Sequence, residues 1–445
     1  MAKVLFVNPV IREEDDPKHV PYGMALLASI IMREGHLVQV YDANAWRAGD
    51  DVLTQVVQAD DWDVIALGGI TTAYGAIKHI VGIAKALAPR ALVVAGGGFL
   101  TSMPHDVMRL LPQVDVGVVG EAFLSFPELL RRVDAGNRDW ASVRGLVWRD
   151  AAGASHLTPE QPLLDDIDRL PYPAWELFPL DIYFRNSTFG FSEEGMAAKR
   201  RLDINASYGC SLICRFCFHL GIAGDMEYVQ KDGQPDVRFG YKRAIRYHSP
   251  RYVVELVKYA RSKFEIDFVS FLDENLMTMH QSSGKTWLTD IARLWIEEGL
   301  QPQCVRDGVP HDPERCSGIH WGGTSHATLC SPEVLKAIKA AGCSHLLYGY
   351  ETFSARVMKP FFATPYPGTE WYQTYKASIL EQYDGNLEEF LLDLGDATKV
   401  TAVISKKFNA VELYGLRELM VLRDVRRIDQ YEREWNRLHA NTAGD

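Results

Sequence analysis

The chain has 445 residues, enough for two or three domains, and its 24% charged and 47% hydrophobic residues are an ordinary balance for a globular protein. Its net charge of −11 argues against an extended nucleic-acid-binding surface, and no stretch approaches the length of a transmembrane helix. The first residues read as a buried strand and not as a signal peptide, and seven cysteines, an odd number, indicate a reducing compartment. We therefore expect a cytoplasmic protein with no nucleic-acid partner and no integral membrane segment.

Strands and helices alternate through residues 3–130. The expected strands are short apolar runs at residues 4–7, 37–41, 64–67, 91–95 and 114–119. The expected helices carry apolar residues at helical spacing and lie at residues 22–33, 52–59, 76–87, 107–111 and 126–133. Buried strands that alternate with amphipathic helices predict a parallel sheet covered by helices on both faces, the doubly wound α/β fold.

Glycines follow three successive strands of this predicted sheet, at Gly68-Gly69, Gly96-Gly97-Gly98 and Gly120. Ligands of doubly wound sheets bind outside the carboxyl ends of the strands, where glycine lets the backbone approach them closely. No G-x-G-x-x-G follows the first strand, so a dinucleotide site is only weakly indicated. The residues alone leave open whether these glycines serve a ligand or only make tight turns.

Residues 136–199 read as a connector, with a small hairpin that turns at Gly153 and an extended strap at Pro171 and Pro173. Strand–helix alternation then resumes from residue 200. The expected strands are residues 202–206, 268–272, 320–324 and 345–350, and the expected helices are residues 249–264, 287–299 and 332–341. Polar residues end these strands, which is typical of a TIM-type barrel with its chemistry on the carboxyl-terminal face.

Two further stretches carry no readable motif. Residues 221–239 are polar and contain glycine, which predicts a long loop of functional use. The tail, residues 370–445, reads as mostly helical, and we expect it to pack over the barrel.

Three cysteines follow the predicted strand at residues 202–206 with the spacing i, i+4 and i+7: Cys210, Cys214 and Cys217. Three thiolates from one short loop can hold three irons of a [4Fe–4S] cluster and leave the fourth iron open to a small molecule. A zinc site usually needs four protein ligands, and the next cysteine, Cys304, lies far along the chain. A disulfide would leave one of the three thiols unused. The spacing therefore predicts an iron–sulfur cluster.

The other candidate groups carry weaker signals. Asp273 and Glu274 end one predicted strand, where a helix-capping turn and a functional loop are equally good interpretations. Glu351 ends a buried apolar strand, where a carboxylate is costly to desolvate, so a functional role is favoured. The remaining cysteines are interpreted as buried structural thiols, and three histidines as satisfied polar residues instead of ligands. These residues are Cys304, Cys316, Cys330, Cys343, His320, His326 and His345.

The C-x3-C-x2-C sequence of Cys210, Cys214 and Cys217 resembles the signature of the radical S-adenosylmethionine (SAM) enzymes. In that family the open iron chelates SAM, and electron transfer cleaves SAM to a 5′-deoxyadenosyl radical. The resemblance implies that the three cysteines are the catalytic cluster ligands and that an electron donor such as flavodoxin or ferredoxin serves the protein. It also implies a SAM site formed by Phe216, Asp273, Glu274 and Glu351, the last in a strand end that matches the family's G-x-E-[ST].

Residues 1–130 resemble the cobalamin-binding domain that precedes many radical SAM domains. The matching pieces are Asn8-Pro9, Pro21-Tyr22-Gly23, Tyr41-Asp42-Ala43, Gly96-Gly97-Gly98 and Gly120-Glu121. The resemblance implies cobalamin contacts from Asn8, Pro9, Gly23, Thr71, Thr72, Tyr74, Gly97, Gly98, Gly120 and Glu121. The cobalt-ligating D-x-H-x-x-G motif of other B12 proteins is absent, so the lower cobalt face is expected to meet Thr71, Thr72, Tyr74 or water.

Together the resemblances imply a Rossmann-like cobalamin-binding domain (1–135), a connector (136–199), a partial radical SAM barrel (200–369) and a helical C-terminal region (370–445). The implied cofactors are a [4Fe–4S] cluster, SAM and cobalamin. The first hypothesis is a methyltransferase, in which the radical abstracts hydrogen from a small molecule and methylcobalamin methylates an unactivated carbon or phosphorus. The alternatives are a non-methylating oxidase, cyclase or ring-rearranging relative, similar to the anaerobic magnesium-protoporphyrin ester cyclase, and a non-catalytic B12 or redox sensor.

The sequence departs from the family pattern after Glu351. The segment Thr364-Pro365-Tyr366-Pro367-Gly368-Thr369 resembles the family's T-P-[FY]-P-G-T motif, yet it follows Glu351 almost at once. The family has two more strand–helix units before that motif, of roughly 30 residues each. Either the barrel is short by about two such units, or a segment is absent from the sequence, and the residues leave both alternatives open.

Overall fold

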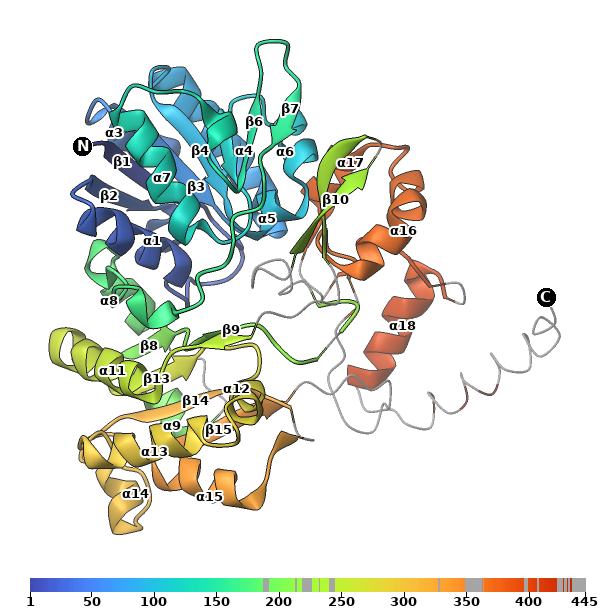
Figure 1. The fold of residues 1–445 in the computed structure, drawn as a ribbon. Helices are drawn as coiled ribbons and strands as arrows, with labels where there is room; N and C mark the ends of the chain where they lie inside the picture. The colour runs from blue at the N-terminus through green and yellow to red at the C-terminus, as the bar shows by residue number, and fades with distance from the viewer. Residues whose placement is uncertain are drawn as a thin grey trace.

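The computed structural model describes residues 1–186, 192–212, 214–217, 226–231, 233–239, 245–326, 329–348, 362, 364–395, 399–405, 408–421, 427, 430 and 433. Within them the chain forms a seven-stranded sheet, a four-stranded sheet and two strand pairs. Figure 1 shows the larger sheet and its helices in blue to cyan above the smaller sheet, whose helices are yellow to orange. No helix among the described residues is long and apolar enough to cross a membrane.

The larger sheet has the strand order β2-β1-β3-β4-β5-β6-β7. Its strands are β1 (Lys3–Asn8), β2 (Leu37–Asp42), β3 (Val64–Gly68), β4 (Leu92–Gly96), β5 (Val116–Val118), β6 (Leu146–Arg149) and β7 (Ser155–Leu157). The first five strands are parallel, as predicted, and the last two are antiparallel. An order of 2-1-3-4-5 is that of a doubly wound sheet whose ligands bind outside the carboxyl ends of β1 and β3.

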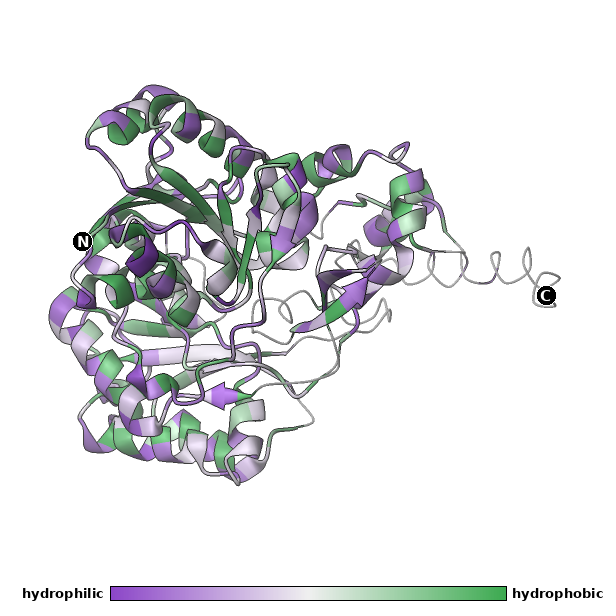
Figure 2. Ribbon diagram, turned by 45° about the horizontal axis from the view of Figure 1, so that its top comes forward, coloured by the Kyte–Doolittle hydropathy of each residue, from purple (hydrophilic) through white to green (hydrophobic). Residues whose placement is uncertain are grey.

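Helices cover both faces of this sheet. They are α1 (Tyr22–Arg33), α2 (Ala43–Trp46), α3 (Asp50–Gln58), α4 (Tyr74–Leu87), α5 (Gly97–Ser102), α6 (Pro104–Leu110) and α7 (Ala122–Asp134). Successive residues of β1 alternate between two cores, with Val4 and Phe6 in one and Leu5 and Val7 in the other. Figure 2 shows the strands as hydrophobic along their length and the helices as mixed. The prediction of a two-faced buried sheet is confirmed.

The four-stranded sheet is parallel, with the order β15-β14-β13-β8. Its strands are β8 (Arg201–Ile204), β13 (Phe268–Phe271), β14 (His320–Ser325) and β15 (Cys343–Tyr348). The helices between them are α11 (Pro250–Phe264), α12 (Leu276–Ser282), α13 (Trp287–Glu297), α14 (Gln303–Asp307) and α15 (Pro332–Ala340). Strands that follow chain order in one direction are the repeat from which a (β/α) barrel is built.

The connector differs from expectation because its hairpin is part of the larger sheet. Strand β6 pairs antiparallel with β5, so the sheet extends to Leu157. Two short helices follow, α8 (Leu180–Arg185) and α9 (Glu193–Ala197). Trp175 in the strap is fully buried among the residues of one core, which explains why this extended segment is held in place.

The stretch at residues 221–239, expected to be a loop, contains a β-hairpin. Its described strands are β10 (Met226–Lys231) and β11 (Gln234–Phe239), which pair antiparallel. Met226, Val237 and Phe239 are buried in the second core of the N-terminal domain. The prediction was wrong because these three apolar side chains are spread among polar residues that face solvent.

The C-terminal helices are α16 (Glu370–Glu381), α17 (Leu387–Asp393) and α18 (Ala410–Val421). The tail was expected to pack over the barrel, but the apolar residues of α16 and α17 pack on the N-terminal domain (Figure 1), and only the start of α16 contacts the loop after β9 (Ser207–Tyr208). Tyr372 and Phe390 stack at 6.0 Å and join the second core of that domain. Their apolar faces are buried there, and an ion pair between Lys376 and Asp106 adds a polar contact.

Candidate functional site

The three predicted cluster ligands lie on one loop beyond the carboxyl end of β8. We call residues 209–212 and 214–217 the cysteine loop. It follows β9 (Ser207–Tyr208), which pairs antiparallel with β12 (Arg246–Tyr247). Cys210, Cys214 and Cys217 are of intermediate exposure and lie outside the disulfide, and the amide of Cys217 donates to the carbonyl of Cys214 at 3.0 Å. The loop thus presents three cysteine side chains from one short segment, as a three-cysteine cluster site requires.

The first turn of α12 holds the start of the cysteine loop. Thr278 accepts a hydrogen bond from the amide of Ser211 at 3.2 Å, and its Oγ1 lies 3.9 Å from the Sγ of Cys210. Asn275 directs its Nδ2 to the same Sγ at 3.9 Å. Thr278 was not predicted from the sequence. Its position three residues after Asn275, which puts both side chains on one helical turn, was the available signal. Donors at a cluster sulfur stabilise the thiolate and tune its redox properties.

Helix α16 holds the other part of the cysteine loop. Arg215 forms an ion pair with Glu370 at 2.7 Å and accepts a backbone hydrogen bond from Trp371 at 3.3 Å. The ring of Phe216, predicted at the SAM site, lies 5.5 Å from the ring of Trp371. The cysteine loop is therefore supported by the C-terminal helices that also pack on the N-terminal domain.

The predicted SAM-site carboxylates divide into three cases. Asp273 is 1% exposed and accepts hydrogen bonds from the amide of Ala206 at 3.1 Å and from the hydroxyl of Ser207. Its burial raises its pKa to about 6 in spite of these donors. Glu274 is partly buried, and Glu351 lies outside the described residues. Asp273 thus fastens the end of β13 to the strand that leads into the cysteine loop.

On the N-terminal sheet, the turns after β3 and β4 pack backbone against backbone. Gly97 has a φ of +82°, and a Cβ there would lie 2.8 Å from the carbonyl oxygen of Gly69. This close approach alone requires glycine, so the tight-turn interpretation explains Gly97. Gly98 is buried in α5, and a Cβ on Gly120 would collide with Met226 of the hairpin.

The turn after β3 contains two buried hydroxyls that lack partners. The Oγ1 atoms of Thr71 and Thr72 have no hydrogen-bond partner among the described residues. A buried hydroxyl without a partner costs free energy, which points to a ligand at this turn. Tyr74, the third candidate for the cobalt face, instead donates its hydroxyl to Glu388 of α17, and burial followed by this bond raises its pKa. Thr71 and Thr72 remain the candidates.

The other predicted contacts lie at the ends of β1 and α1. Asn8 is 3% exposed and donates to Asp42 at 2.7 Å, which joins the ends of β1 and β2. Pro9 lies beside Gly69, whose Cβ would be 3.7 Å from its ring. Gly23 is exposed in the first turn of α1.

A buried ion pair joins the carboxyl edge of the first sheet to the strand pair that precedes the cysteine loop. Glu121, predicted as a cobalamin contact, binds Arg246 through contacts of 2.7 and 3.0 Å, and both side chains are about 10% exposed. The guanidinium of Arg246 also lies 5.3 Å from the ring of Tyr208, which packs against Phe123 at 5.8 Å. Glu121 is therefore an interdomain residue, which spacing in the sequence cannot reveal.

A second polar contact crosses the same interface. His19, in the loop after β1, lies 2.6 Å from Asp203 of β8, and Arg201 lies 3.5 Å from the same carboxylate. Burial raises the pKa of Asp203, but the contacts with His19 and Arg201 outweigh burial and hold the pKa below its ordinary value. Beside them, Tyr22 donates to the carbonyl of Asn205 at 3.3 Å. Polar contacts thus hold the carboxyl edge of the first sheet, where cobalamin is predicted, against the four-stranded sheet that carries the cysteine loop.

Two of the scattered cysteines are not isolated, contrary to expectation. Cys304 and Cys316 form a disulfide beside His311 and His320. The prediction was wrong because the loop after α14 folds back and brings Cys316 to Cys304, 12 residues earlier in the chain. Cys330 and Cys343 are outside the disulfide and of intermediate exposure, where buried structural thiols were expected.

Comparison with known proteins agrees with this arrangement. Residues 9–130 match the B12 binding domain family. The chain is 26% identical over 364 residues to an uncharacterized methyltransferase of Pyrococcus horikoshii, with 81% of this chain and 67% of the relative covered. It is 22% identical to the cytidylyl-2-hydroxyethylphosphonate methyltransferase of Streptomyces wedmorensis (62% and 55% covered) and 22% identical to the anaerobic magnesium-protoporphyrin IX monomethyl ester cyclase of Rubrivivax gelatinosus (78% and 55% covered).

Two solved structures share the fold. The radical SAM methyltransferase TsrM from Kitasatospora setae, with cobalamin and a [4Fe–4S] cluster bound, superposes with a TM-score of 0.55 at 18% identity, covering 78% of this chain and 60% of that one. The cobalamin-dependent SAM radical enzyme OxsB, with aqua-cobalamin and SAM bound, gives 0.60 at 14% identity, covering 97% and 56%. The chain shares the fold of these two enzymes and matches the B12 binding domain family over residues 9–130.

The relatives confirm the resemblance inferred from the cysteine loop and the N-terminal glycines, and they confirm an α/β fold similar to TsrM and OxsB. The chain spans 55–67% of the length of the three curated relatives named above. The donor sets fit the group of cofactors that TsrM and OxsB hold. Three cysteines on one short loop suit an iron–sulfur cluster, and the hydroxyls of Thr71 and Thr72 suit a polar ligand over the first sheet.

Proposed function

We propose that this chain is a cobalamin-dependent radical SAM methyltransferase that acts on a small molecule. The observation that carries the proposal is the spacing of three cysteines on the cysteine loop, which is held against a B12-binding domain by the buried pair Glu121–Arg246. When bound, the cluster would supply the electron that cleaves SAM, and cobalamin would carry the methyl group. Methyl transfer is favoured over other radical chemistry because the Pyrococcus horikoshii relative, matched over 81% of this chain at 26% identity, and the solved structure of TsrM are both named methyltransferases.

In this proposal the residues of the cysteine loop have distinct roles. Cys210, Cys214 and Cys217 ligate three irons, and Thr278 with Asn275 orients Cys210. Asp273 positions the loop through Ala206 and Ser207 without contacting the cluster. Phe216, Glu274 and Glu351 stay proposed SAM contacts, carried by the family resemblance.

On the other side, the hydroxyls of Thr71 and Thr72 would donate or accept hydrogen bonds at the cobalamin. Gly97, Gly98 and Gly120 stay proposed cobalamin contacts, carried by the family resemblance. The contacts between the two domains would exclude water from the space where the cofactors meet, which protects radical intermediates from side reactions. We also propose a cytoplasmic location with a flavodoxin or ferredoxin as one-electron donor, a partial barrel as the second domain and the boundaries 1–135, 136–199, 200–369 and 370–445.

The proposal can be tested without knowing the substrate. The full chain is reconstituted anaerobically with iron, sulfide and cobalamin, then given a low-potential reductant and SAM that carries a deuterated methyl group. We expect 5′-deoxyadenosine in solution and deuterated methyl on the cobalamin extracted from the protein, both measured by mass spectrometry. The Cys214→Ala variant should bind cobalamin and make no 5′-deoxyadenosine. Wild-type protein that binds cobalamin and leaves SAM intact would support a non-catalytic sensor and overturn the proposal.

A second candidate is a non-methylating oxidase or cyclase. Three of the curated relatives are anaerobic magnesium-protoporphyrin IX monomethyl ester cyclases, which is the observation in its favour. The same experiment separates the two, because this candidate makes 5′-deoxyadenosine while the deuterated methyl group stays off cobalamin.

A further inference from the structure

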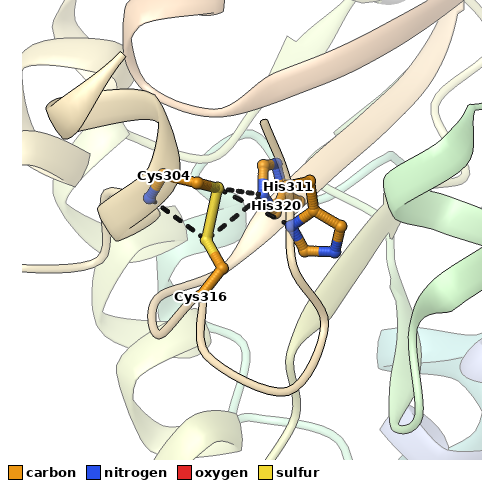
Figure 3. A group of neighbouring side chains, drawn as sticks. All are labelled: Cys304, His311, Cys316 and His320. Carbon is orange, nitrogen blue, oxygen red and sulfur yellow. Dashed lines mark hydrogen bonds between the residues drawn. A yellow bond between two sulfur atoms is a disulfide. The ribbon is translucent and has the colours of Figure 1, made fainter. Parts of the chain in front are cut away.

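A second group of metal-ligating side chains lies at the amino-terminal end of the four-stranded sheet (Figure 3). We call Cys304, His311, Cys316 and His320 the Cys/His group. Cys304 is on α14, His311 and Cys316 are in the loop that follows it, and His320 is the first residue of β14. One ligand atom from each of the four lies within 4.8 Å of all the others. The cysteine loop leaves the opposite, carboxyl end of the sheet.

The distances in the Cys/His group match those of a tetrahedral zinc site. Zn–S bonds of about 2.3 Å and Zn–N bonds of about 2.0 Å at the tetrahedral angle place sulfur and nitrogen about 3.5 Å apart. The Sγ of Cys304 lies 3.6 Å from Nδ1 of His311 and 3.4 Å from Nε2 of His320, and the Sγ of Cys316 lies 4.0 Å from the latter. The two imidazole planes are inclined by 85°. Two thiolates and two imidazoles are a structural zinc donor set.

A disulfide accounts for only half of this group. Cys304 and Cys316 are bonded in this structure, and that bond needs neither imidazole. His320 is 6% exposed, and the contacts of its Nε2 are the two sulfurs. Sulfur is a weak hydrogen-bond acceptor, so a buried imidazole whose Nε2 meets only the sulfurs of a disulfide is poorly satisfied at that atom. A metal ion would satisfy both imidazoles and both sulfurs at once.

We propose that, in the reduced chain, Cys304, His311, Cys316 and His320 bind one Zn²⁺ as a structural site. A dithiol reductant supplies two electrons and two protons to the disulfide, which gives two thiols and the oxidised dithiol. Zinc binding then releases two protons as the thiols become thiolates. The sulfurs separate to about 3.8 Å, the distance set by two Zn–S bonds at the tetrahedral angle. The amide of Cys304 lies 3.2 Å from the Sγ of Cys316, where it stabilises the thiolate.

The site would fasten a loop that otherwise has few anchors. Residues 308–318 contain no helix or strand and are mostly exposed, with Val309 at 55%. Gly318 at the end of this loop has a φ of +105°, and a Cβ there would lie 2.6 Å from the carbonyl oxygen of Gln301. Closing the loop fixes the point at which the chain enters β14, between β13 and β15. Residues at the amino-terminal end of such a sheet serve stability and not catalysis.

The test counts metal in a full chain that lacks the cluster ligands, with Cys210, Cys214 and Cys217 all replaced by alanine. This parent is reduced with a dithiol and titrated with Co²⁺, then Zn²⁺. We expect one Co²⁺ per chain, with the intense visible absorption of a tetrahedral ion and a thiolate charge-transfer band, and its displacement by one Zn²⁺. Cys304→Ser and His320→Ala should each lower bound metal at least tenfold, and the matched control Cys330→Ala should retain it.

A second measurement does not depend on those variants folding. Arg306 and Arg315 flank or lie in the loop with exposed side chains, so trypsin should cleave the reduced parent there more slowly with Zn²⁺ than with a chelator. A reduced parent that takes up no tetrahedral Co²⁺, or a disulfide that resists the dithiol, would overturn the proposal and leave a structural disulfide. Retention of the ion by both ligand variants would overturn it as well. No outcome depends on SAM cleavage, so the proposed function can fail independently.

Discussion

The cysteine loop and the Cys/His group lie at opposite ends of the same four-stranded sheet and are built in opposite ways. The three thiols of the cysteine loop lie within residues 210–217, but their supports come from α12, from α16 and, through Tyr208, from the N-terminal domain. The Cys/His group spreads over residues 304–320, while its described contacts stay within one strand–helix unit. At the carboxyl end of the sheet, which we call the reactive end, the candidate ligands are close in sequence and their supports are distant. At the amino-terminal end, the four side chains of the Cys/His group are spread more widely, and their contacts are local.

The largest expected effect is that a substitution in the cysteine loop lowers activity, whereas one in the Cys/His group lowers stability. Cys214→Ala should reduce 5′-deoxyadenosine formation by about a thousand-fold or more, because a cluster with two protein ligands is not held for SAM cleavage. Its free energy of unfolding should change little, since the thiol is only partly buried. Cys304→Ser should show the reverse, losing about 2–4 kcal/mol of stability through the opened loop while each folded molecule still cleaves SAM. Urea unfolding measures the stability of both variants, and analysis of 5′-deoxyadenosine measures their activity. Equal losses of activity would contradict the separation.

The difference between the two ends also explains what could be predicted from the sequence. The spacing of Cys210, Cys214 and Cys217 shows a site because all three ligands are local. His311 and His320 carry no such signal, because the path of the loop between α14 and β14 brings them to Cys304.

The same rule holds for the fold. The apolar runs of β1 to β5 predicted the parallel sheet, since each strand is buried on both faces. The position of α16 and α17, and the pairing of Glu121 with Arg246, depend on tertiary contacts between segments far apart in the chain. Thr278 is an intermediate case between local and tertiary signals. Its helix was not predicted, but its spacing of three residues from Asn275 can be seen in the sequence.

The next effect tests whether the reactive end depends on the N-terminal domain. Arg246→Ala leaves Glu121 buried without its partner, which should cost about 3–5 kcal/mol of stability. It should also lower cluster loading, because Arg246 lies in the strand that pairs with β9 and packs on Tyr208. Metal uptake by the Cys/His group should stay at one ion per chain.

A double-mutant cycle gives the control for this prediction. Adding Glu121→Ala to Arg246→Ala should restore part of the lost stability, because the unpaired buried carboxylate is removed. Urea unfolding of the four chains measures the coupling. Strictly additive losses would contradict the coupling of Glu121 with Arg246. A fall in metal uptake at the Cys/His group would show that the two ends of the sheet are not independent.

The smallest effect concerns pH and the carboxylate that positions the cysteine loop. Burial raises the pKa of Asp273 from 3.8 to about 6, so the folded state prefers the protonated acid. The stability that this preference contributes is complete below about pH 4 and is lost as the pH rises through 6, a difference of about 3 kcal/mol. Asp273→Asn removes this dependence. The free energy of unfolding of the variant minus that of the wild type should therefore rise between pH 4 and pH 7.

Asp203 is the matched control because it is also buried at the carboxyl end of the sheet, yet its pKa is lowered by His19 and Arg201. A lowered pKa in the folded state contributes stability above the ordinary value of 3.8 and loses it as the pH falls. Asp203→Asn should therefore be least stable relative to the wild type at neutral pH, with the gap closing in acid. Opposite slopes for the two variants in urea unfolding, measured on the cluster-free chain, would show that Asp273 is held at a cost in stability that positions the loop. Parallel slopes would mean that Asp273 is ionised in the folded protein without a cost in stability. The contact between Asp273 and Ser207 would then not be a costly support of the cysteine loop.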